Sequence, residues 1–197
     1  MKRVFLSLLV ISLTYHLQAQ FLINNHIVHY DCQTNTWLAT IPETMFGKDN
    51  QLTITIQDGW NDLTIDNNKV DNQHTFNNIT AESIYQTSIT DVEGNTITGI
   101  IQFTFLPIIH LNGDFTYEYQ NGTVTVSDPD KQSDDYELTA RIKWRGGITN
   151  TDDKHKRNYN IKFDDDIKLL DMRKDNNWML DAGQPDVFRI RNRIATS

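Results

Sequence analysis

Short stretches in which apolar and polar side chains partly alternate recur along the first half of the chain. Four of them are rich in β-branched residues and predict half-buried strands: residues 36–41, 51–57, 83–90 and 95–106. Turn-forming residues separate these strands at Asp58-Gly59, Asp66-Asn67-Asn68 and Glu93-Gly94-Asn95. This spacing predicts a β-sandwich-like domain over residues 20–106, with Pro107 as a plausible boundary.

A second series of strands is predicted after Pro107. Asn121-Gly122 lies between FTYEYQ and TVTVS and predicts a tight hairpin, because both residues tolerate positive φ. Residues 127–135 form an expected solvated acidic loop, in which Pro129 and the lack of a Gly-centred twelve-residue pattern argue against calcium. Residues 136–147 then predict another strand.

Strand periodicity in NYNIKF separates two sets of side chains. Tyr159, Ile161 and Phe163 fall on one face of the predicted strand, and Lys162 falls on the other. Five apolar residues further along are expected in a core: Leu169, Leu170, Met172, Trp178 and Leu180. Gln184-Pro185-Asp186 predicts the start of a helix, so the fold class is mainly β (α+β).

The first nineteen residues have the order of a signal peptide. Lys2 and Arg3 precede an apolar segment from Val4 to Tyr15, and a polar segment with Ala19 follows. Twelve apolar residues are too few to cross a hydrocarbon core of about 30 Å as a helix. We therefore expect an exported protein, at the periplasm, the cell surface or outside the cell, cleaved near Ala19 and without stable membrane insertion.

The charge is distributed unevenly along the chain. The net charge is −8, yet residues 141–197 carry 13 Lys/Arg against 9 Asp/Glu, while residues 1–140 carry 5 against 17. The two parts either have different partners or are simply solvated surfaces. The interleaved acidic residues of the basic part leave little net phosphate neutralisation, so a nucleic-acid partner is not expected.

The cysteine content and the histidine spacing argue against a disulfide and against a metal site. Cys32 is the single cysteine, so no intrachain disulfide is possible. His26, His29 and Cys32 follow one another at three-residue steps, which would align them on a helix. The neighbouring β-branched and aromatic residues favour a strand, where such steps alternate faces, so no metal site is predicted.

Residues 144–163 leave two interpretations open. Gly146 and Gly147 permit a tight turn, and Lys154, Lys156 and Arg157 add positive charge. The segment is either an ordinary hairpin with a charged tip or a device that holds phosphate. Without the full P-loop spacing, local chemistry favours the hairpin.

Five ordered motifs in the last third of the chain resemble the CotH kinase family, the spore coat protein H-like proteins. They are Arg145-Gly146, Lys156 to Phe163, Leu169 to Met172, Asn177 to Leu180, and Arg191-Asn192. The resemblance implies an atypical protein-kinase-like fold whose incomplete N-lobe spans residues 107–197. Residues 20–106 resemble the accessory β domain of exported members.

The resemblance also implies a nucleotide site, with ATP and Mg²⁺ as cofactors and a secreted or surface protein as substrate. Lys162 would correspond to the phosphate-pairing lysine of the third N-lobe strand. Arg145, Gly146 and Lys156 would lie near the nucleotide, and Arg191 would lie on the helix that supports Lys162. Asp171 departs from the family pattern, which commonly has Gly there.

No catalytic or metal-binding residue is assigned in this chain. The family's acidic residues for proton acceptance and Mg²⁺ lie in a C-terminal lobe beyond position 197. We therefore expect the chain to be the N-terminal part of an exported CotH-like kinase and to be inactive alone. The alternative is a non-enzymatic β-rich surface module that binds glycan or protein, or a kinase remnant.

Export with cleavage near Ala19 is directly measurable. Intact-mass analysis of exported protein should give a mass that lacks residues 1–19, because the basic, apolar and polar segments occur in the order that signal peptidase recognises. A mass that begins at Met1 would contradict the expectation.

Overall fold

The computed structural model describes residues 20–32, 34–131, 135–146 and 157–181. Within these ranges the regular structure is β, apart from two short 3-10 helices, η1 (Glu43–Met45) and η3 (Leu169–Asp171). The mainly β fold class is therefore confirmed for the described part of the chain. The predicted signal peptide and the predicted helix after Pro185 lie outside the described residues.

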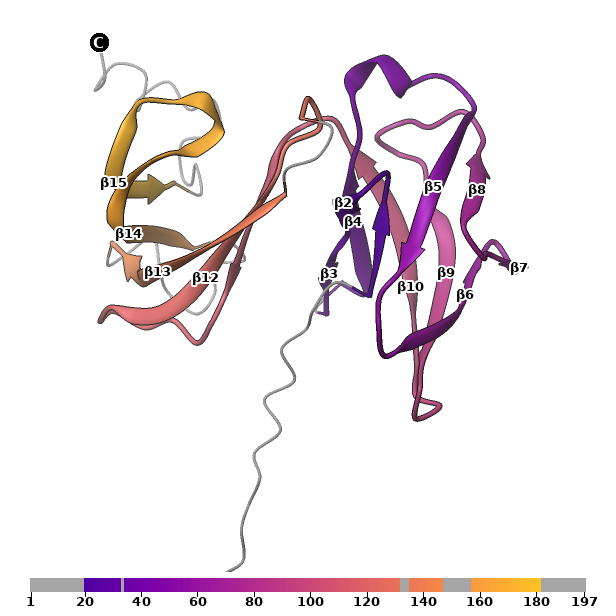
Figure 1. The fold of residues 1–197 in the computed structure, drawn as a ribbon, viewed down its shortest axis with the longest axis horizontal. Coiled ribbons are helices and arrows are strands. Elements are labelled where there is room, and N and C mark those ends of the chain that lie inside the picture. The colour runs from indigo at the N-terminus through magenta and orange to yellow at the C-terminus, as the bar shows by residue number, and fades with distance from the viewer. Residues whose placement is uncertain (1–19, 33, 132–134, 147–156, 182–197) are drawn as a thin grey trace, which may run out of the picture.

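Two sheets make up the first unit (Figure 1). One has the order β2-β1-β5-β8 and the other the order β3-β4-β10-β9-β6-β7. The strands are β1 (Phe21–Ile23), β2 (His26–Ile27), β3 (His29–Asp31), β4 (Thr36–Thr40), β5 (Asn50–Ile56), β6 (Trp60–Ile65), β7 (Asn68–Lys69), β8 (Gln73–Phe76), β9 (Tyr85–Asp91) and β10 (Thr96–Thr104). All four strand ranges predicted here correspond to observed strands, β4, β5, β9 and β10.

Side chains from both sheets of the first unit share one buried core. Trp37, Phe21 and Phe76 are fully buried, and the ring of Phe76 lies 4.9 Å from those of Tyr85 and Phe103, measured between centroids. The Trp37 indole N–H donates to the buried Gln20 amide oxygen at 3.0 Å. The alternation seen in the sequence thus supplies two apolar sheet faces that pack together.

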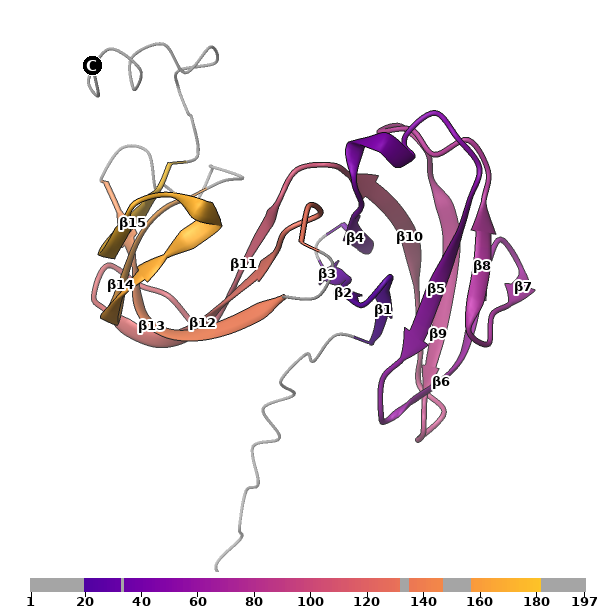
Figure 2. The same cartoon turned by 45° about the horizontal axis from the view of Figure 1, so that its top comes forward.

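The second unit is a single antiparallel meander with the order β11-β12-β13-β14-β15. Its strands are β11 (Ile108–Asn112), β12 (Gln120–Ser127), β13 (Tyr136–Arg145), β14 (Asn158–Lys168) and β15 (Lys174–Leu180). Figure 2 shows the sheet curving along β12 and β13. Its separate core includes Val124, Val126, Ile142, Ile161 and Phe163.

The change from one unit to the other occurs around Pro107, since β10 ends at Thr104 and β11 begins at Ile108. Each unit has its own core. The assignment of residues 20–106 and 107–197 as separate domains stays a prediction.

The hairpin predicted at Asn121-Gly122 is wrong. Both residues lie inside β12, where Asn121 pairs with Arg141 and Gly122 with Ala140. A Cβ on Gly122 would lie 2.7 Å from the Asn112 carbonyl oxygen and 2.8 Å from the Phe115 ring. This glycine therefore allows close packing on an extended strand, and it serves no turn.

Two further expectations need correction. Met172 was expected in a core but is 46% exposed, whereas Leu169, expected in the same core, is buried. Positive φ at Leu170 and Asp171 turns the chain at η3, so that Met172 leaves the core. The predicted solvated loop at 127–135 is anchored at both described ends, because Ser127 is fully buried and the Asp135 side chain is 5% exposed.

Gly99 on β10 should be intolerant of a side chain. A Cβ there would lie 2.1 Å from the Asn35 carbonyl oxygen and 2.9 Å from the Trp37 ring, so backbone must move. We expect Gly99→Ala to lower the free energy of unfolding by about 1–3 kcal/mol in urea denaturation.

Gly47→Asn is the matched control. Gly47 has φ +70° and open space around its Cα, and Asn tolerates this conformation. Equal urea midpoints for Gly99→Ala and the unmodified protein would contradict the packing described here.

Candidate functional site

Two rows of side chains, all polar except Met179, cross the face of the second sheet that lies opposite its core. In one row Asn121, Arg141, Lys162 and Asn177 are register partners on β12, β13, β14 and β15. In the next row Lys143, Asn160 and Met179 are partners. Register partners project from the same face of a sheet. We call these seven residues the cationic face.

Lys162 occupies the middle of the cationic face. Its neighbours Ile161 and Phe163 are buried in the core, so strand alternation directs Lys162 away from them. This confirms the predicted separation of the strand into two faces. Arg141 lies directly across the ladder, with its Cα about 5 Å away.

The three cations of this face differ in their partners. The Arg141 guanidinium lies 3.8 Å from a carboxylate oxygen of Asp164, and both side chains are well exposed. The Lys143 ammonium lies 4.6 Å from the centre of the Tyr119 ring. Lys162 is half-buried and has no ion pair or hydrogen bond with any described residue. Lys162 is therefore the cation best placed to accept an anionic ligand.

The remaining predicted site residues have different outcomes. Arg145 pairs with Asn158 and lies four residues from Arg141 along β13, about 14 Å away. Gly146 directly follows β13 and has φ +88°, a conformation suited to a turn. β13 and β14 pair as antiparallel strands, but the tip between them lies outside the described residues, so the choice between a plain hairpin and a phosphate-holding segment stays open. Lys156 and Arg191 lie outside the described residues.

Arg157 contributes to the opposite side of the hairpin. Its guanidinium lies 4.2 Å from the centre of the Trp144 ring, and Trp144 pairs with Tyr159, whose ring packs on the core. A cation in this position covers aromatic surface. Arg157 therefore lies away from the cationic face, and Lys154 and Lys156 of the predicted basic cluster lie outside the described residues.

The cationic face also contains an unsatisfied acceptor. The Asn160 side-chain oxygen is buried and has no hydrogen-bond partner. Such an atom carries a desolvation cost that a ligand donor would remove. Positive charge and an unpaired amide together suit a ligand that has both acceptor and donor groups.

The described residues fit a nucleotide's phosphates better than they fit a metal ion. The two rows of the cationic face contain three cations, three amides and one methionine, and no carboxylate. No group of three or more His, Cys, Asp or Glu that could hold a metal occurs within the described ranges. No step is therefore assigned to Mg²⁺.

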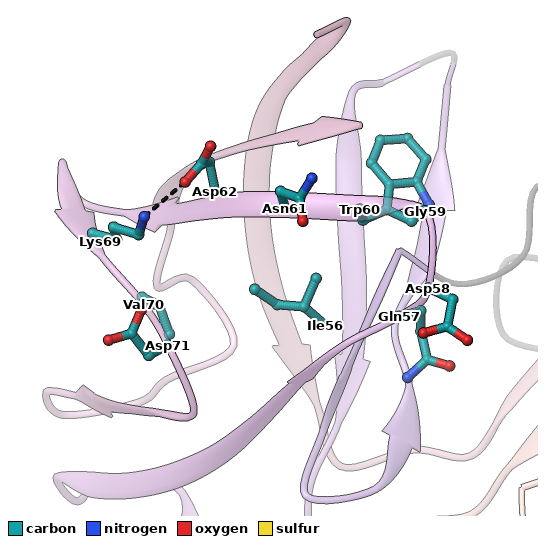
Figure 3. A pocket seen from close by; sticks show the side chains of 10 residues that line it. All are labelled: Ile56, Gln57, Asp58, Gly59, Trp60, Asn61, Asp62, Lys69, Val70 and Asp71. Atoms are coloured by element: carbon teal, nitrogen blue, oxygen red, sulfur yellow. Dashed lines mark hydrogen bonds and ion pairs between the residues drawn. The ribbon is translucent and has the colours of Figure 1, made fainter. Parts of the chain in front are cut away.

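The first unit has an open groove of about 530 Å³ between the end of β5 and the strands β6 and β7 (Figure 3). Trp60 and Asp58 lie at one end, near the Gly59 turn. At the other end the Lys69 ammonium bonds to an Asp62 carboxylate oxygen at 2.7 Å. This bond raises the pKa of Lys69 above its ordinary value.

Comparisons with protein-family models, with curated proteins and with solved structures each found no match. In the part of the chain that the structure describes, no helix is long and apolar enough to cross a membrane.

Of the three cations on the cationic face, sequence reasoning identified Lys162 and missed Arg141 and Lys143. The signal was present in TARIKWR, where alternation places Arg141, Lys143 and Arg145 on one face. The pairing of Arg141 with Lys162 depends on the β13–β14 register, which the sequence pattern alone leaves open.

Proposed function

We propose that the second unit binds the phosphates of a nucleotide on its cationic face, as the N-lobe-like part of an exported CotH-like kinase. The single observation that carries the proposal is the position of Lys162. This half-buried lysine lies opposite Arg141, on the polar face of a sheet whose other face is buried. A lysine directed from a strand toward phosphates is the arrangement that protein kinases use.

Charge supports a phosphate ligand in particular. Three cations occupy two adjacent rows, and the one ion pair recorded for them within the described residues is the exposed contact of 3.8 Å between Arg141 and Asp164. An extended polyphosphate can contact Lys162 and Arg141 together, because their strands are hydrogen-bonded neighbours. Arginine also offers a planar fork that matches phosphate oxygens.

Phosphoryl transfer needs more than this face provides. It requires carboxylates or amides that hold Mg²⁺ and an acidic group that accepts the substrate proton. The family resemblance assigns those groups to a second lobe. The proposal for the described residues is therefore nucleotide binding, with a secreted or surface protein as the eventual phosphate acceptor.

Lys162→Ala should weaken binding of ATP and of inorganic tripolyphosphate to the whole chain by roughly ten- to a hundredfold. A lost charge-assisted hydrogen bond costs about 1.5–3 kcal/mol. Isothermal titration calorimetry, with and without Mg²⁺, measures the affinities, and circular dichroism verifies that the variant is folded.

Lys168→Ala is the matched control on the same strand. Lys168 is 60% exposed and lies 3.4 Å from Asp171, so its loss should change affinity little. If both variants bind tripolyphosphate as tightly as the unmodified protein, Lys162 is a surface strand residue and the proposal is wrong.

The groove of the first unit favours a second candidate function, a surface module that binds glycan. Trp60 offers an aromatic surface on which the C–H groups of a sugar ring can pack. Asp58, Gln57 and Asn61 line the same groove and provide acceptors and donors for hydroxyl groups. An open polar groove with one aromatic residue suits a neutral oligosaccharide better than an anion.

Trp60→Ala should weaken binding of a neutral oligosaccharide at least about threefold, since aromatic contacts contribute about 0.5–1.5 kcal/mol beyond burial. Tyr119→Ala, an exposed aromatic residue of the other unit, serves as the control in the same glycan titration. Binding that is absent, or equal in both variants, would remove this candidate.

A further inference from the structure

A compact set of polar contacts joins the two units and involves no residue of either candidate ligand site. Nδ1 of His26 on β2 donates to a carboxylate oxygen of Asp135 at 3.0 Å. The backbone N–H of Ile27 donates to the other oxygen of the same carboxylate. The side chains of His26 and Asp135 are 6% and 5% exposed, so one buried carboxylate fastens the strand β2 to the start of β13.

His29 on β3 makes the second set of contacts. Its Nε2 is hydrogen-bonded to the Ser127 hydroxyl at the end of β12, at 3.0 Å. Its ring also lies against that of His110 on β11, with 4.9 Å between ring centres and 31° between ring planes. Both His29 and Ser127 are buried. We call the residues His26, His29, His110, Ser127 and Asp135 the joint.

The joint contains no apolar side chain of either core. Each core comprises residues of its own unit, and no strand of one unit pairs with a strand of the other within the described residues. Figure 2 shows the ends of β12 and β13 near β2 and β3. The two units are therefore joined at this position by polar contacts, and two of the groups that make them are buried histidines.

The two histidines have different neighbours. His26 faces the Asp135 carboxylate. His29 is buried beside His110, and its protonation places a cation in a desolvated site next to a second titratable ring. Two carboxylates oppose the effect of burial on these rings. Asp135 raises the pKa of His29, and Glu137 on β13 raises the pKa of His110.

We propose that the joint is a pH-sensitive docking device, in which protonation of His29 releases the second unit from the first while both remain folded. His29 is the residue that responds, and His110 increases its response. Ser127 and Asp135 hold the closed arrangement at neutral pH. The device concerns the arrangement of the units and does not rest on the proposed nucleotide or glycan function.

The direction of the effect follows from burial. Burial, and next the proximity of His110, lower the pKa of His29 from 6.5 to about 4 in the docked form, against a smaller opposing effect of Asp135. Burial also lowers the pKa of His110. The docked form is therefore fully stabilised above pH 6.5 and loses stability as the pH falls from 6.5 toward 4.

Small-angle X-ray scattering of the whole chain between pH 7.5 and pH 4.5 tests the proposal. The radius of gyration should be constant near neutral pH and increase as the pH falls below 6.5. Far-UV circular dichroism should keep its strand signal over the same range. His29→Gln, which stays uncharged, should remain compact to lower pH than the unmodified protein. His29→Lys, which introduces a permanent cation, should be extended already at pH 7.5.

His74→Gln is the matched control, because burial lowers the pKa of His74 as well but its ring packs on Phe76 inside the first unit. It should show the same expansion as the unmodified protein. Three results would overturn the proposal: a radius of gyration that does not change with pH, equal expansion of His29→Gln and the unmodified protein, or expansion that coincides with loss of the strand signal.

Discussion

A sheet that buries apolar side chains on one face only must present its other face to solvent, to a ligand or to another part of the chain. In the second unit this constraint acts on five strands at once. Ile142, Ile161 and Trp178 are register partners across three of them and pack on the core side. Because strands alternate strictly, Arg141, Lys162 and Asn177 are then aligned on the opposite side. The residues that pack in the core therefore determine which residues of each strand form the cationic face.

The same constraint also fixes the positions of the side chains on the cationic face. The side chains project from paired strands, and a slip of one residue in the pairing would transfer Ile161 to solvent and Lys162 to the core. Burial of Ile161 therefore fixes the position of Lys162. A site built on strands in this way is held more firmly than one built on loops.

Much of the fold could be predicted from local pattern, and the failures have physical reasons. Alternation identified β4, β5, β9, β10 and the two faces of β14, since it depends only on neighbouring residues. The hairpin predicted at Asn121-Gly122 was wrong because the turn preference of this pair competes with tertiary packing. In this protein the requirement for a small residue beneath Phe115 dominates. The prediction that Met172 lies in a core was wrong because the positive φ at Leu170 and Asp171 is not evident from apolar composition.

The joint and the full cationic face could not have been derived from the sequence pattern. His26 and Asp135 are 109 positions apart, and His29 and Ser127 are 98 apart. Such contacts depend on how the two units approach each other, which the local pattern of apolar and polar residues does not encode. The sequence did single out His26 and His29, and it correctly favoured strands at both. It gave no indication that their partners would be a carboxylate and a hydroxyl group of the other unit.

If the second unit binds a nucleotide as we propose, phosphate binds at the cationic face and at no other basic surface of the described chain. Chemical-shift mapping of the ¹⁵N-labelled protein during titration with tripolyphosphate identifies the contacted residues without a variant. We expect saturable shifts concentrated at Arg141, Lys143, Asn160 and Lys162. Shifts centred instead on the exposed Arg173 and Lys174, or spread evenly over all basic residues, would contradict this expectation.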